Sequence, residues 1–380
     1  MKQVYYVGFY NGKHCKNRDE TEANIAGSMK MDFVKECIKE LGYRVILVSI
    51  TVNKIPGLYK MEHVIIDEKE EHYYLPYFSI PNKKRGVGAN ITALFSLYFF
   101  AMFKFHKDDI VINYHSLAYG FFFRRLNIIK KIKWIPQIEE MYCMSRKDYQ
   151  DTNYLKKEEK MLQNADGYLF VNDLLPKRYA NGKPYAVSYG NYKVFCDQKT
   201  CDDTNIGVVY TGIINDDRGV FKIIEAIPLL PQKYSLHILG FGDDENMKRM
   251  HNLLDKINDK STCQRVFFYG TKTGEDYTEF LSTYQIGVSL MDTSDAVSLN
   301  AFPSKILAYM GHSLFVVSSK SQCIVNSKVS DLLYYCDNTS ESIATAIQKI
   351  SVEQVNKSAD RLNFMKQEFI IDLKKVLEGC

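Results

Sequence analysis

Short apolar runs alternate with helical stretches along most of this chain, and this alternation restricts its fold more than any other feature of the sequence. In the first half, the apolar run "VYYVGFY" (Val4–Tyr10) is followed by a polar loop containing glycine, by the helical stretch "AGSMKMDFVKECIKELGY" and by the apolar run "RVILVSI". The short apolar runs "DIVINYHS", "WIPQI" and "GYLFVN" come later. Such alternation predicts an α/β architecture built on parallel sheets.

A second series of the same kind begins near Gly207. Its strand-like runs are "GVVYTGI", "SLHILGFG", "RVFFYGT" and "IGVSLM", and helical stretches such as "VFKIIEAIPLL" and "ENMKRMHNLLDKI" separate them. The stretch between the two series, "ANGKPYAVSYGNYKVFCDQKTCDDTN", is polar and interrupted by glycine and proline, which is typical of a linker. We therefore predict two α/β domains, residues 1–190 and 191–360, with a ligand-binding cleft between the carboxy ends of their sheets.

Composition agrees with a two-domain protein of a reducing compartment. The chain has 380 residues, of which 46% are hydrophobic and 25% charged, so it can bury large cores. Its nine cysteines are odd in number and none forms a CxxC pair, which argues against a disulfide scaffold or a zinc site. The amino terminus "MKQVYYVGFY" predicts a strand without a signal sequence, and no apolar run is long enough to span a membrane. We expect a cytoplasmic protein.

Positive charge gathers in the first half of the chain. Residues 1–190 contain 29 basic and 21 acidic residues, against 20 and 24 in the remainder. The apolar run "ITALFSLYFFAMF" (Ile91–Phe103) lies between the basic segments "KKR" (Lys83–Arg85) and "RRLNIIKKIKW" (Arg124–Trp134). One interpretation is a buried helix with solvated basic loops. The other is a patch that rests on an anionic membrane leaflet, at the inner face of the membrane.

Glycines and basic residues recur where the strands of the second series end. Backbone amides at the start of a helix and neighbouring cations favour phosphate, although each such turn alone is equally typical of a solvated first turn or a tight turn. Lys305 in "NAFPSK" places a cation in the first turn of a helix, which the helix dipole disfavours unless an anion is bound. The residues at these turns are Gly212, Arg218, Lys222, Gly240, Gly242, Gly270 and Lys305.

These motifs resemble those of the family-4 retaining glycosyltransferases, group 1 enzymes of bacterial polysaccharide synthesis. The family has the GT-B fold of two facing Rossmann-like domains. "YTGIINDDRGVFKIIEAI", "LHILGFG" and "NAFPSKILAYMGHSLFVVSS" carry the resemblance, whereas in the first half it rests on the order of elements. It implies that the second domain binds a nucleotide-diphosphate sugar and the first binds the acceptor. It also implies that a terminal helix, residues 361–380, crosses back to the first domain, with a dimerising helix as the alternative.

The resemblance assigns residues by position. Arg218 stands where the family usually has a diphosphate-binding lysine, and Lys305 lies near the same phosphates. On the acceptor side, Glu139 and Glu140 are candidates to polarise the acceptor hydroxyl, and His115 is either a cleft residue or a packed structural histidine. The implied donor-binding set is Gly212, Arg218, Lys222, Gly240, Gly242, Gly270, Asn300, Ala301, Phe302, Ser304 and Lys305, and the implied acceptor-side set is Gly12, His115, Glu139 and Glu140.

Four positions depart from the family's pattern. The two donor-loop glutamates that the family usually carries align with Asn300 and Ala308. Asn300 can still hydrogen-bond a sugar hydroxyl, but Ala308 has no group that could bind a ribose. Ile213 replaces the arginine that usually follows the strand glycine, and Glu139 stands near the usual histidine of the first domain. Together these departures raise the question whether the chain catalyses a reaction.

The leading hypothesis is a retaining, metal-independent hexosyltransferase that needs no cofactor. It would move a sugar from a nucleotide-diphosphate sugar to a saccharide or lipid-linked saccharide in surface polysaccharide assembly, with Arg218, Lys222 and Lys305 stabilising the leaving diphosphate. The acidic runs "DTSD" and "GDDE" are interpreted as loop caps, not as metal ligands. The alternative is a non-catalytic GT-B subunit that stabilises or guides a partner glycosyltransferase. An epimerase on this fold would need clustered carboxylates and histidines, and a nucleic-acid partner is not expected.

Overall fold

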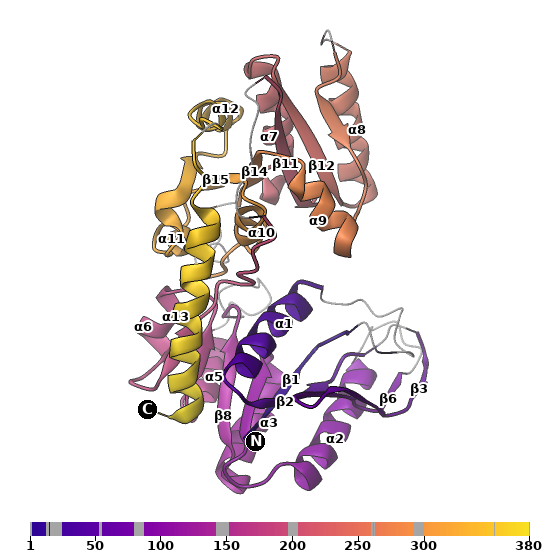
Figure 1. Ribbon diagram of the computed structural model, residues 1–380. Helices are drawn as coiled ribbons and strands as arrows, with labels where there is room; N and C mark the ends of the chain where they lie inside the picture. Colours follow the sequence, from indigo (N-terminus) through magenta and orange to yellow (C-terminus); the bar gives the residue numbers. More distant parts are fainter. Residues whose placement is uncertain are drawn as a thin grey trace. The chain divides into compact units, whose positions relative to one another are not determined.

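The chain divides into two compact units in a computed structural model (Figure 1). Unit 1 comprises Met1–Asn191 and Glu368–Cys380, and unit 2 comprises Tyr192–Gln367. The sequence predicts domain boundaries after residue 190 and after residue 360. The structure describes residues 2–12, 15, 25–52, 55–79, 87–141, 152–196, 204–259, 261, 263–291, 293, 300–352 and 354–379. Each unit is described by itself below.

The described part of unit 1 is built on an eight-stranded sheet in the order β10-β9-β8-β7-β1-β2-β5-β4. Every neighbouring pair is parallel except β4 and β5. Strand β1 is buried along nearly its whole length, as a strand covered on both faces must be. The strands are β1 (Gln3–Gly8), β2 (Arg44–Ser49), β4 (Glu62–Asp67), β5 (Glu70–Tyr74), β7 (Ile110–Tyr114), β8 (Lys133–Ile138), β9 (Tyr168–Phe170) and β10 (Tyr185–Val187).

Helices cover both faces of this sheet. The connection from β1 to β2 runs in one direction across the sheet, and those from β5 to β7 and from β7 to β8 run in the other. Because parallel crossovers are right-handed, α1 lies on one face and α2 and α3 lie on the opposite face. The helices are α1 (Ile25–Glu40), α2 (Val87–Lys104), α3 (Leu117–Lys130), α5 (Thr152–Leu162) and α6 (Leu174–Tyr179).

Two parts of unit 1 differ from the sequence-based prediction. The stretch predicted to be a linker contributes β10, which pairs with β9 as an edge strand of the sheet. The region between β2 and α2 contains strands that the alternation did not indicate: β4 and β5 form an antiparallel pair, and β3 (Gly57–Tyr59) pairs with β6 (Tyr77–Ser79). Short, polar strands of this kind depend on pairing with a neighbour, which sequence periodicity does not report. The general prediction of an α/β architecture with parallel sheets is confirmed.

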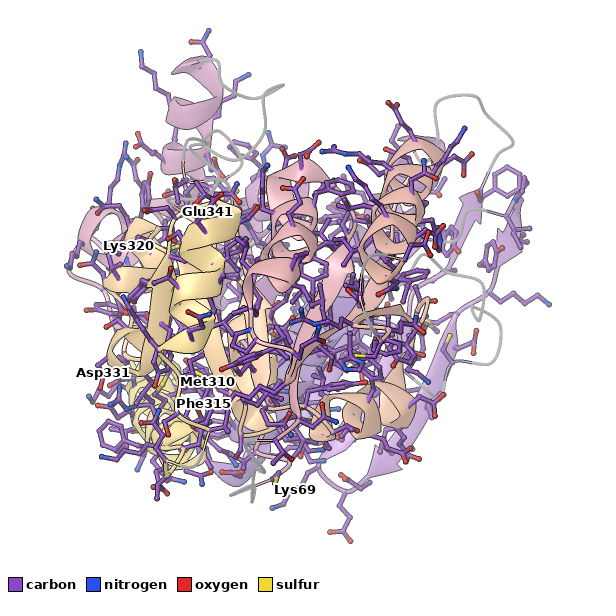
Figure 2. All side chains as sticks on the ribbon, turned by 90° about the horizontal axis from the view of Figure 1, so that it is seen from above. Lys69, Met310, Phe315, Lys320, Asp331 and Glu341 are labelled. Carbon is purple, nitrogen blue, oxygen red and sulfur yellow. The ribbon has the colours of Figure 1, made fainter. Side chains whose placement is uncertain are left out.

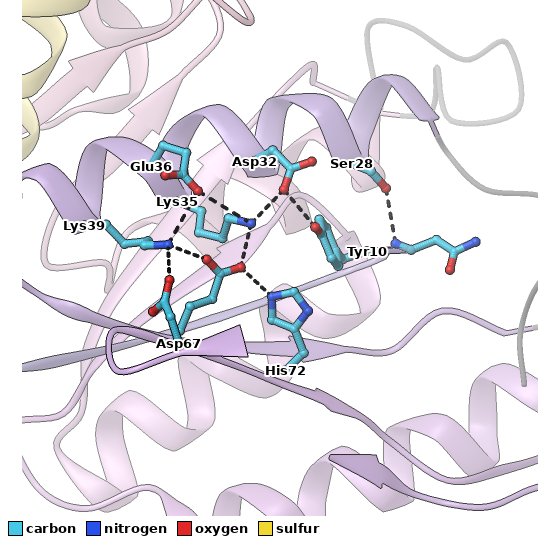
Figure 3. Close-up of polar contacts among 10 residues, drawn as sticks. Tyr10, Ser28, Asp32, Lys35, Glu36, Lys39, Asp67 and His72 are labelled. Carbon is cyan, nitrogen blue, oxygen red and sulfur yellow. Dashed lines mark hydrogen bonds and ion pairs between the residues drawn. The ribbon is translucent and has the colours of Figure 1, made fainter. Parts of the chain in front are cut away.

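A buried ionic network joins α1 to β5 (Figure 3). Lys35 Nζ and Lys39 Nζ each lie 2.7 Å from a carboxylate oxygen of Glu70, and His72 Nε2 lies 2.7 Å from Glu70 Oε1. Asp32 extends the network because its Oδ1 accepts from Lys35 Nζ at 2.9 Å. Burial alone would raise the pKa of Glu70, but the hydrogen bonds from His72 and the two lysines hold that pKa far below its usual range.

Unit 2 contains, within its described residues, a six-stranded parallel sheet in the order β13-β12-β11-β14-β15-β16. Relative to the chain this is the order 3-2-1-4-5-6 of a dinucleotide-binding Rossmann fold, with its switch point between β11 and β14. The strands are β11 (Ile206–Ile213), β12 (Tyr234–Phe241), β13 (Val266–Phe268), β14 (Ile286–Ser289), β15 (Phe315–Ser319) and β16 (Leu333–Cys336).

Apolar side chains fill the space between this sheet and its helices. Met310 and Phe315 are buried, whereas Lys320, Asp331 and Glu341 lie exposed at the surface of the unit (Figure 2). The helices are η2 (Asp216–Arg218), α7 (Val220–Ala226), η3 (Ile227–Leu229), α8 (Asp244–Asn258), α9 (Gly274–Ser282), α10 (Lys305–Gly311), α11 (Gln322–Val325), η5 (Ser330–Leu332) and α12 (Ser340–Gln348).

The terminal helix α13 (Ser358–Glu378) begins three residues before the predicted boundary at 361 and contributes to both units. Its second half packs on unit 1, where the rings of Phe33 and Phe369 lie 5.4 Å apart. The Lys133 ammonium donates to the Leu377 carbonyl at 2.8 Å. Within the described ranges, none of the helices combines the length and the apolar character that crossing a membrane requires.

We expect Glu70→Gln to destabilise unit 1 by about 3 kcal/mol, because two buried lysine contacts lose their carboxylate. The wild-type stabilisation is complete above the unfolded pKa of about 4.3 and is lost as pH falls through the lower folded pKa. Asp67→Asn is the control, since Asp67 also contacts Lys39 but is 48% exposed, and should cost less than about 1 kcal/mol. Hydrogen exchange of the β2 and β5 amides measures the loss of stability in both variants. Equal protection in the two variants would contradict the prediction.

Candidate functional site

The switch point of the unit 2 sheet brings together residues that are far apart in the sequence. Gly212 lies at the carboxy end of β11, and Lys305 is the first residue of α10, which follows β14. In open α/β sheets, ligands bind outside the carboxy ends of the strands at this point. The Lys305 ammonium lies so close to Gly212 that a Cβ at residue 212 would collide with it.

Three glycines let the loops at this edge pack closely. Gly212 has φ +136°, a conformation that other residues rarely adopt. Its carbonyl oxygen approaches the Cα of Gly240, and the Ile214 carbonyl lies 2.7 Å from where a Cβ of Gly242 would be. The Gly240 amide in turn donates to the Gly270 carbonyl at 2.8 Å. These predicted residues therefore shape the edge through their backbones.

Lys305 is a cation without a counterion among the described residues. Its Nζ lies 4.5 Å from the centroid of the Tyr210 ring, and the Tyr210 hydroxyl donates to the Ile213 carbonyl at 2.6 Å, which orients that ring. Burial, together with the positive charge of Arg218, lowers the pKa of Lys305 to about 7. An anion bound here would reverse this unfavourable electrostatic environment.

Arg218 contributes the second positive charge. It ends the short helix η2, where the Asn215 side chain accepts from the Arg218 amide at 3.1 Å. Gly219 follows with φ +66° and lets the chain turn into α7. The guanidinium is partly buried and forms no ion pair with any residue that the structure describes. Arg218 and Lys305 thus concentrate positive charge at one edge, and nothing described there neutralises it.

A hydroxyl network behind Gly212 was not anticipated from the sequence. The Tyr309 hydroxyl accepts from the Thr211 amide at 3.0 Å, and Thr211 Oγ1 lies 3.2 Å from the Tyr277 hydroxyl. Burial raises the pKa of Tyr277, so its hydroxyl stays protonated. Tyrosines on helices are common core residues, so the sequence pattern gave no signal for this network. Only the fold shows that Tyr277 on α9 and Tyr309 on α10 both point towards β11. The network supports the strand end that carries Gly212.

The other predicted donor-side residues fall into different environments. Lys222 lies 3.0 Å from Glu225 on the exposed side of α7, so its charge is already paired. Asn300 and Phe302 are buried, Ala301 is partly buried and Ser304 is exposed before α10. Ala308 lies within α10, where its carbonyl is 2.8 Å from His312 Nδ1. The start of α8 carries Asp243, Asp244 and Glu245, which makes that turn unsuitable for a diphosphate.

The predicted acceptor-side residues follow the carboxy ends of three adjacent strands in unit 1. Gly12 follows β1, His115 follows β7, and Glu139 and Glu140 follow β8. Since β1 and β7 lie on either side of the direction reversal in the strand order, this edge is the switch point of the unit 1 sheet. The four residues that the resemblance implies on the acceptor side thus follow strands that end at this edge.

Contacts distinguish these four residues from one another. Glu139 forms an ion pair with Lys30 of α1, and its Oε1 accepts from Gln137 Nε2 at 2.6 Å. Glu140 is partly exposed and contacts no charged or hydrogen-bonding group in the part of the chain that the structure describes. His115 is buried with its Nε2 3.4 Å from Glu158 Oε1, a packed arrangement. Gly12 borders the Tyr10 ring.

Comparisons with known proteins agree with this geometry. Residues 205–352 match the family of glycosyl transferases group 1. No curated protein sequence matches the chain. The structure of Anabaena HepE in complex with UDP has a TM-score of 0.63 at 10% identity, over 99% of this chain and 98% of that one. An α,α-trehalose-phosphate synthase (UDP-forming) from Burkholderia vietnamiensis has a TM-score of 0.63 at 11% identity, over 100% of both chains.

At such low identity the structural likeness shows the fold alone, whereas the family match identifies the domain that contains Gly212, Arg218 and Lys305. The sequence-based prediction of a group 1 domain is therefore confirmed for unit 2. The chain has the two-domain α/β fold of GT-B glycosyltransferase structures, and residues 205–352 form a group 1 glycosyltransferase domain.

Proposed function

We propose that the chain transfers a sugar, with retention of configuration, from a UDP-sugar bound at the unit 2 switch point. The observation that carries the proposal is that Lys305, beside Gly212, and the neighbouring Arg218 have no counterion within the described ranges. The similar Anabaena structures contain UDP and UDP-glucose, which supports uridine as the nucleoside of the donor. The leaving diphosphate develops charge in the transition state, and cations held in place before the reaction stabilise that charge without reorganising. We propose no metal or cofactor for this step.

On the acceptor side we propose that Glu139 polarises the attacking hydroxyl. Its carboxylate is oriented from two directions by Lys30 and Gln137, and its side chain is only 12% exposed. An oriented carboxylate can accept a proton from a hydroxyl within hydrogen-bond reach. We propose a saccharide or lipid-linked saccharide of surface polysaccharide assembly as the acceptor. The family-4 assignment belongs to the same proposal.

A non-catalytic role is the second candidate, and Asn300 and Ala308 favour it. Both stand where the resembling family carries glutamates, and Ala308 offers only a methyl group. Titration of the purified chain with UDP, GDP and ADP distinguishes the two candidates. Base-selective binding followed by slow hydrolysis of the matching nucleotide sugar supports the enzyme, and indifference to all three nucleotides supports the subunit.

Binding of UDP should depend on pH through Lys305. With its pKa lowered to about 7, Lys305 is mostly neutral above that pH, and a bound diphosphate must supply the free energy to protonate it. Affinity should therefore fall between pH 7 and 9, by up to about tenfold per unit. Calorimetry in buffers of different ionisation enthalpy should detect proton uptake. In Lys305→Met the dependence of UDP affinity on pH should vanish. An unchanged dependence would contradict the assignment of Lys305 to the diphosphate site.

Replacement of Arg218 by alanine should weaken UDP binding by about 1.5–3 kcal/mol, the usual value of hydrogen bonds to charged groups. The same variant should raise the pKa of Lys305, because a neighbouring positive charge is removed. Lys248→Ala is the matched control, since Lys248 is exposed on α8. Calorimetric titration measures all three proteins, and equal affinity for Arg218→Ala and Lys248→Ala would exclude a phosphate contact.

Glu139→Gln should lower transfer about 100-fold or more while UDP affinity stays within about twofold. Lys30→Met keeps the carboxylate but removes its ion pair, so it should reduce transfer less. Glu159→Gln on α5 is a control for a glutamate away from the edge. Steady-state transfer rates and UDP affinity are measured for each variant. If Glu139→Gln lowers UDP affinity as much as it lowers the transfer rate, Glu139 has a structural role.

A further inference from the structure

The outer face of α2 is apolar and exposed. Phe103 is 78% exposed and Phe95 is 62% exposed, values that are unusual for phenylalanine in a globular protein. At 3.6 residues per turn, the exposed apolar residues fall within about 140° of the helix circumference. They are Ile91, Phe95, Tyr98, Phe99, Met102 and Phe103.

The opposite face of the same helix accounts for its attachment to unit 1. Ala93, Leu97, Phe100 and Ala101 are buried, and the Phe100 ring lies 5.1 Å from the ring of Tyr73 on β5. Helix α2 is therefore apolar on both sides, but only one side is needed for the core. A surface helix normally carries polar residues on its outer face. A contiguous apolar surface of this kind marks an interaction site.

Neighbouring elements enlarge this surface. Tyr98 on α2 contacts Phe122 on α3, with ring centroids 6.4 Å apart. At the end of α3, Ile128 and Ile129 are 54% and 73% exposed. At the other end of α2, the Phe78 amide donates to Thr92 Oγ1, which joins the antiparallel pair of β3 and β6 to the helix (Figure 1). We call the exposed apolar residues of α2 and α3 the α2–α3 face.

Basic residues outnumber acidic residues around the face, although the Asp108 amide donates to the Lys131 carbonyl at 3.0 Å and so brings one acidic residue close to it. Residues 87–133 contain seven basic and two acidic residues, and the acidic pair, Asp108 and Asp109, lies in the loop before β7. Arg125 and Lys131 are exposed beside the two isoleucines of α3. Lys130 instead donates to the Ala101 and Met102 carbonyls at the end of α2. The sequence-based prediction includes Lys130 and Lys133 in the basic patch, whereas in the structure both ammonium groups donate to carbonyls at the ends of helices. The predicted basic segment at 83–85 lies outside the described residues.

We propose that the α2–α3 face docks on the surface of an anionic lipid bilayer. Aromatic and aliphatic side chains enter the boundary between headgroups and acyl chains, and neighbouring basic residues attract anionic headgroups. A second copy of the chain is the competing occupant. Pairing two such faces would bring Arg125 and Lys131 of each copy near those of the other, which like-charge repulsion opposes. Charge complementarity therefore favours the bilayer.

The direction of α2 gives this docking a consequence for the reaction. The helix begins after β6 and ends just before β7, so it runs back from the carboxy edge of the unit 1 sheet. A bilayer lying along α2 would thus extend to the edge where Glu139 is found. If the proposed function holds, an acceptor anchored in the bilayer could reach that edge without leaving the membrane. The docking itself does not require sugar transfer.

Co-sedimentation with vesicles tests the proposal. The full chain should bind vesicles of equal parts phosphatidylglycerol and phosphatidylcholine, bind pure phosphatidylcholine weakly, and lose binding when high salt shortens the screening length below about 8 Å. The double variants Phe99→Ser with Phe103→Ser, and Arg125→Glu with Lys131→Glu, should each weaken binding at least about tenfold. Phe364→Ser on α13 is the matched control, since Phe364 is 59% exposed and belongs to unit 2.

Two further measurements keep the outcome decisive. UDP titration of the same variants should be unchanged, which separates loss of docking from loss of folding or of donor binding. In Phe103→Trp, emission should shift to shorter wavelength on adding anionic vesicles, because residue 103 enters the interface. Absence of vesicle binding at low salt overturns the proposal. It is equally overturned if the chain forms a dimer that the same substitutions dissociate.

Discussion

Two positive charges of unit 2 lie close enough to affect each other, and no counterion pairs with them among the residues that the structure describes. Lys305 lies beside the Gly212 backbone and above the Tyr210 ring, and the Arg218 charge lowers its pKa. A partly buried cation next to another cation costs free energy, and the protein accepts that cost only where something else compensates. The glycines at the edge and the hydroxyl network behind β11 are arranged around this site. The diphosphate that we propose as the ligand would supply the missing negative charge.

In unit 1, by contrast, two carboxylates are paired with basic side chains of the same unit. Glu70 is surrounded by two lysines and a histidine, and Glu139 is paired with Lys30. These contacts satisfy the charges of Glu70 and Glu139 within the folded unit, whereas Glu140 contacts no charged or hydrogen-bonding group among the described residues. The contrast with Arg218 and Lys305 supports the proposal that unit 2 binds the donor and unit 1 the acceptor.

The apolar α2–α3 face is a large feature of the described residues that neither edge explains. Core packing needs only the inner side of α2, where Leu97 and Phe100 are buried. The exposed Phe95 and Phe103 weaken solubility without strengthening the fold, so an external contact is the simplest reason for their presence. Such a contact is compatible with sugar transfer at a membrane surface and independent of the chemistry of the donor site.

Much of this protein was predictable from the sequence because its strands and helices differ in periodicity and length. The alternation determined the α/β architecture, and the glycine and lysine turns identified Gly212, Arg218 and Lys305, since parallel strands place all such turns at one edge of a sheet. Only the tertiary structure decided the contacts among side chains distant in sequence. Tyr210 lies under Lys305, Lys222 turns to Glu225, and Lys130 caps α2. Side-chain partners across elements depend on register and rotamer, and no local sequence pattern encodes either.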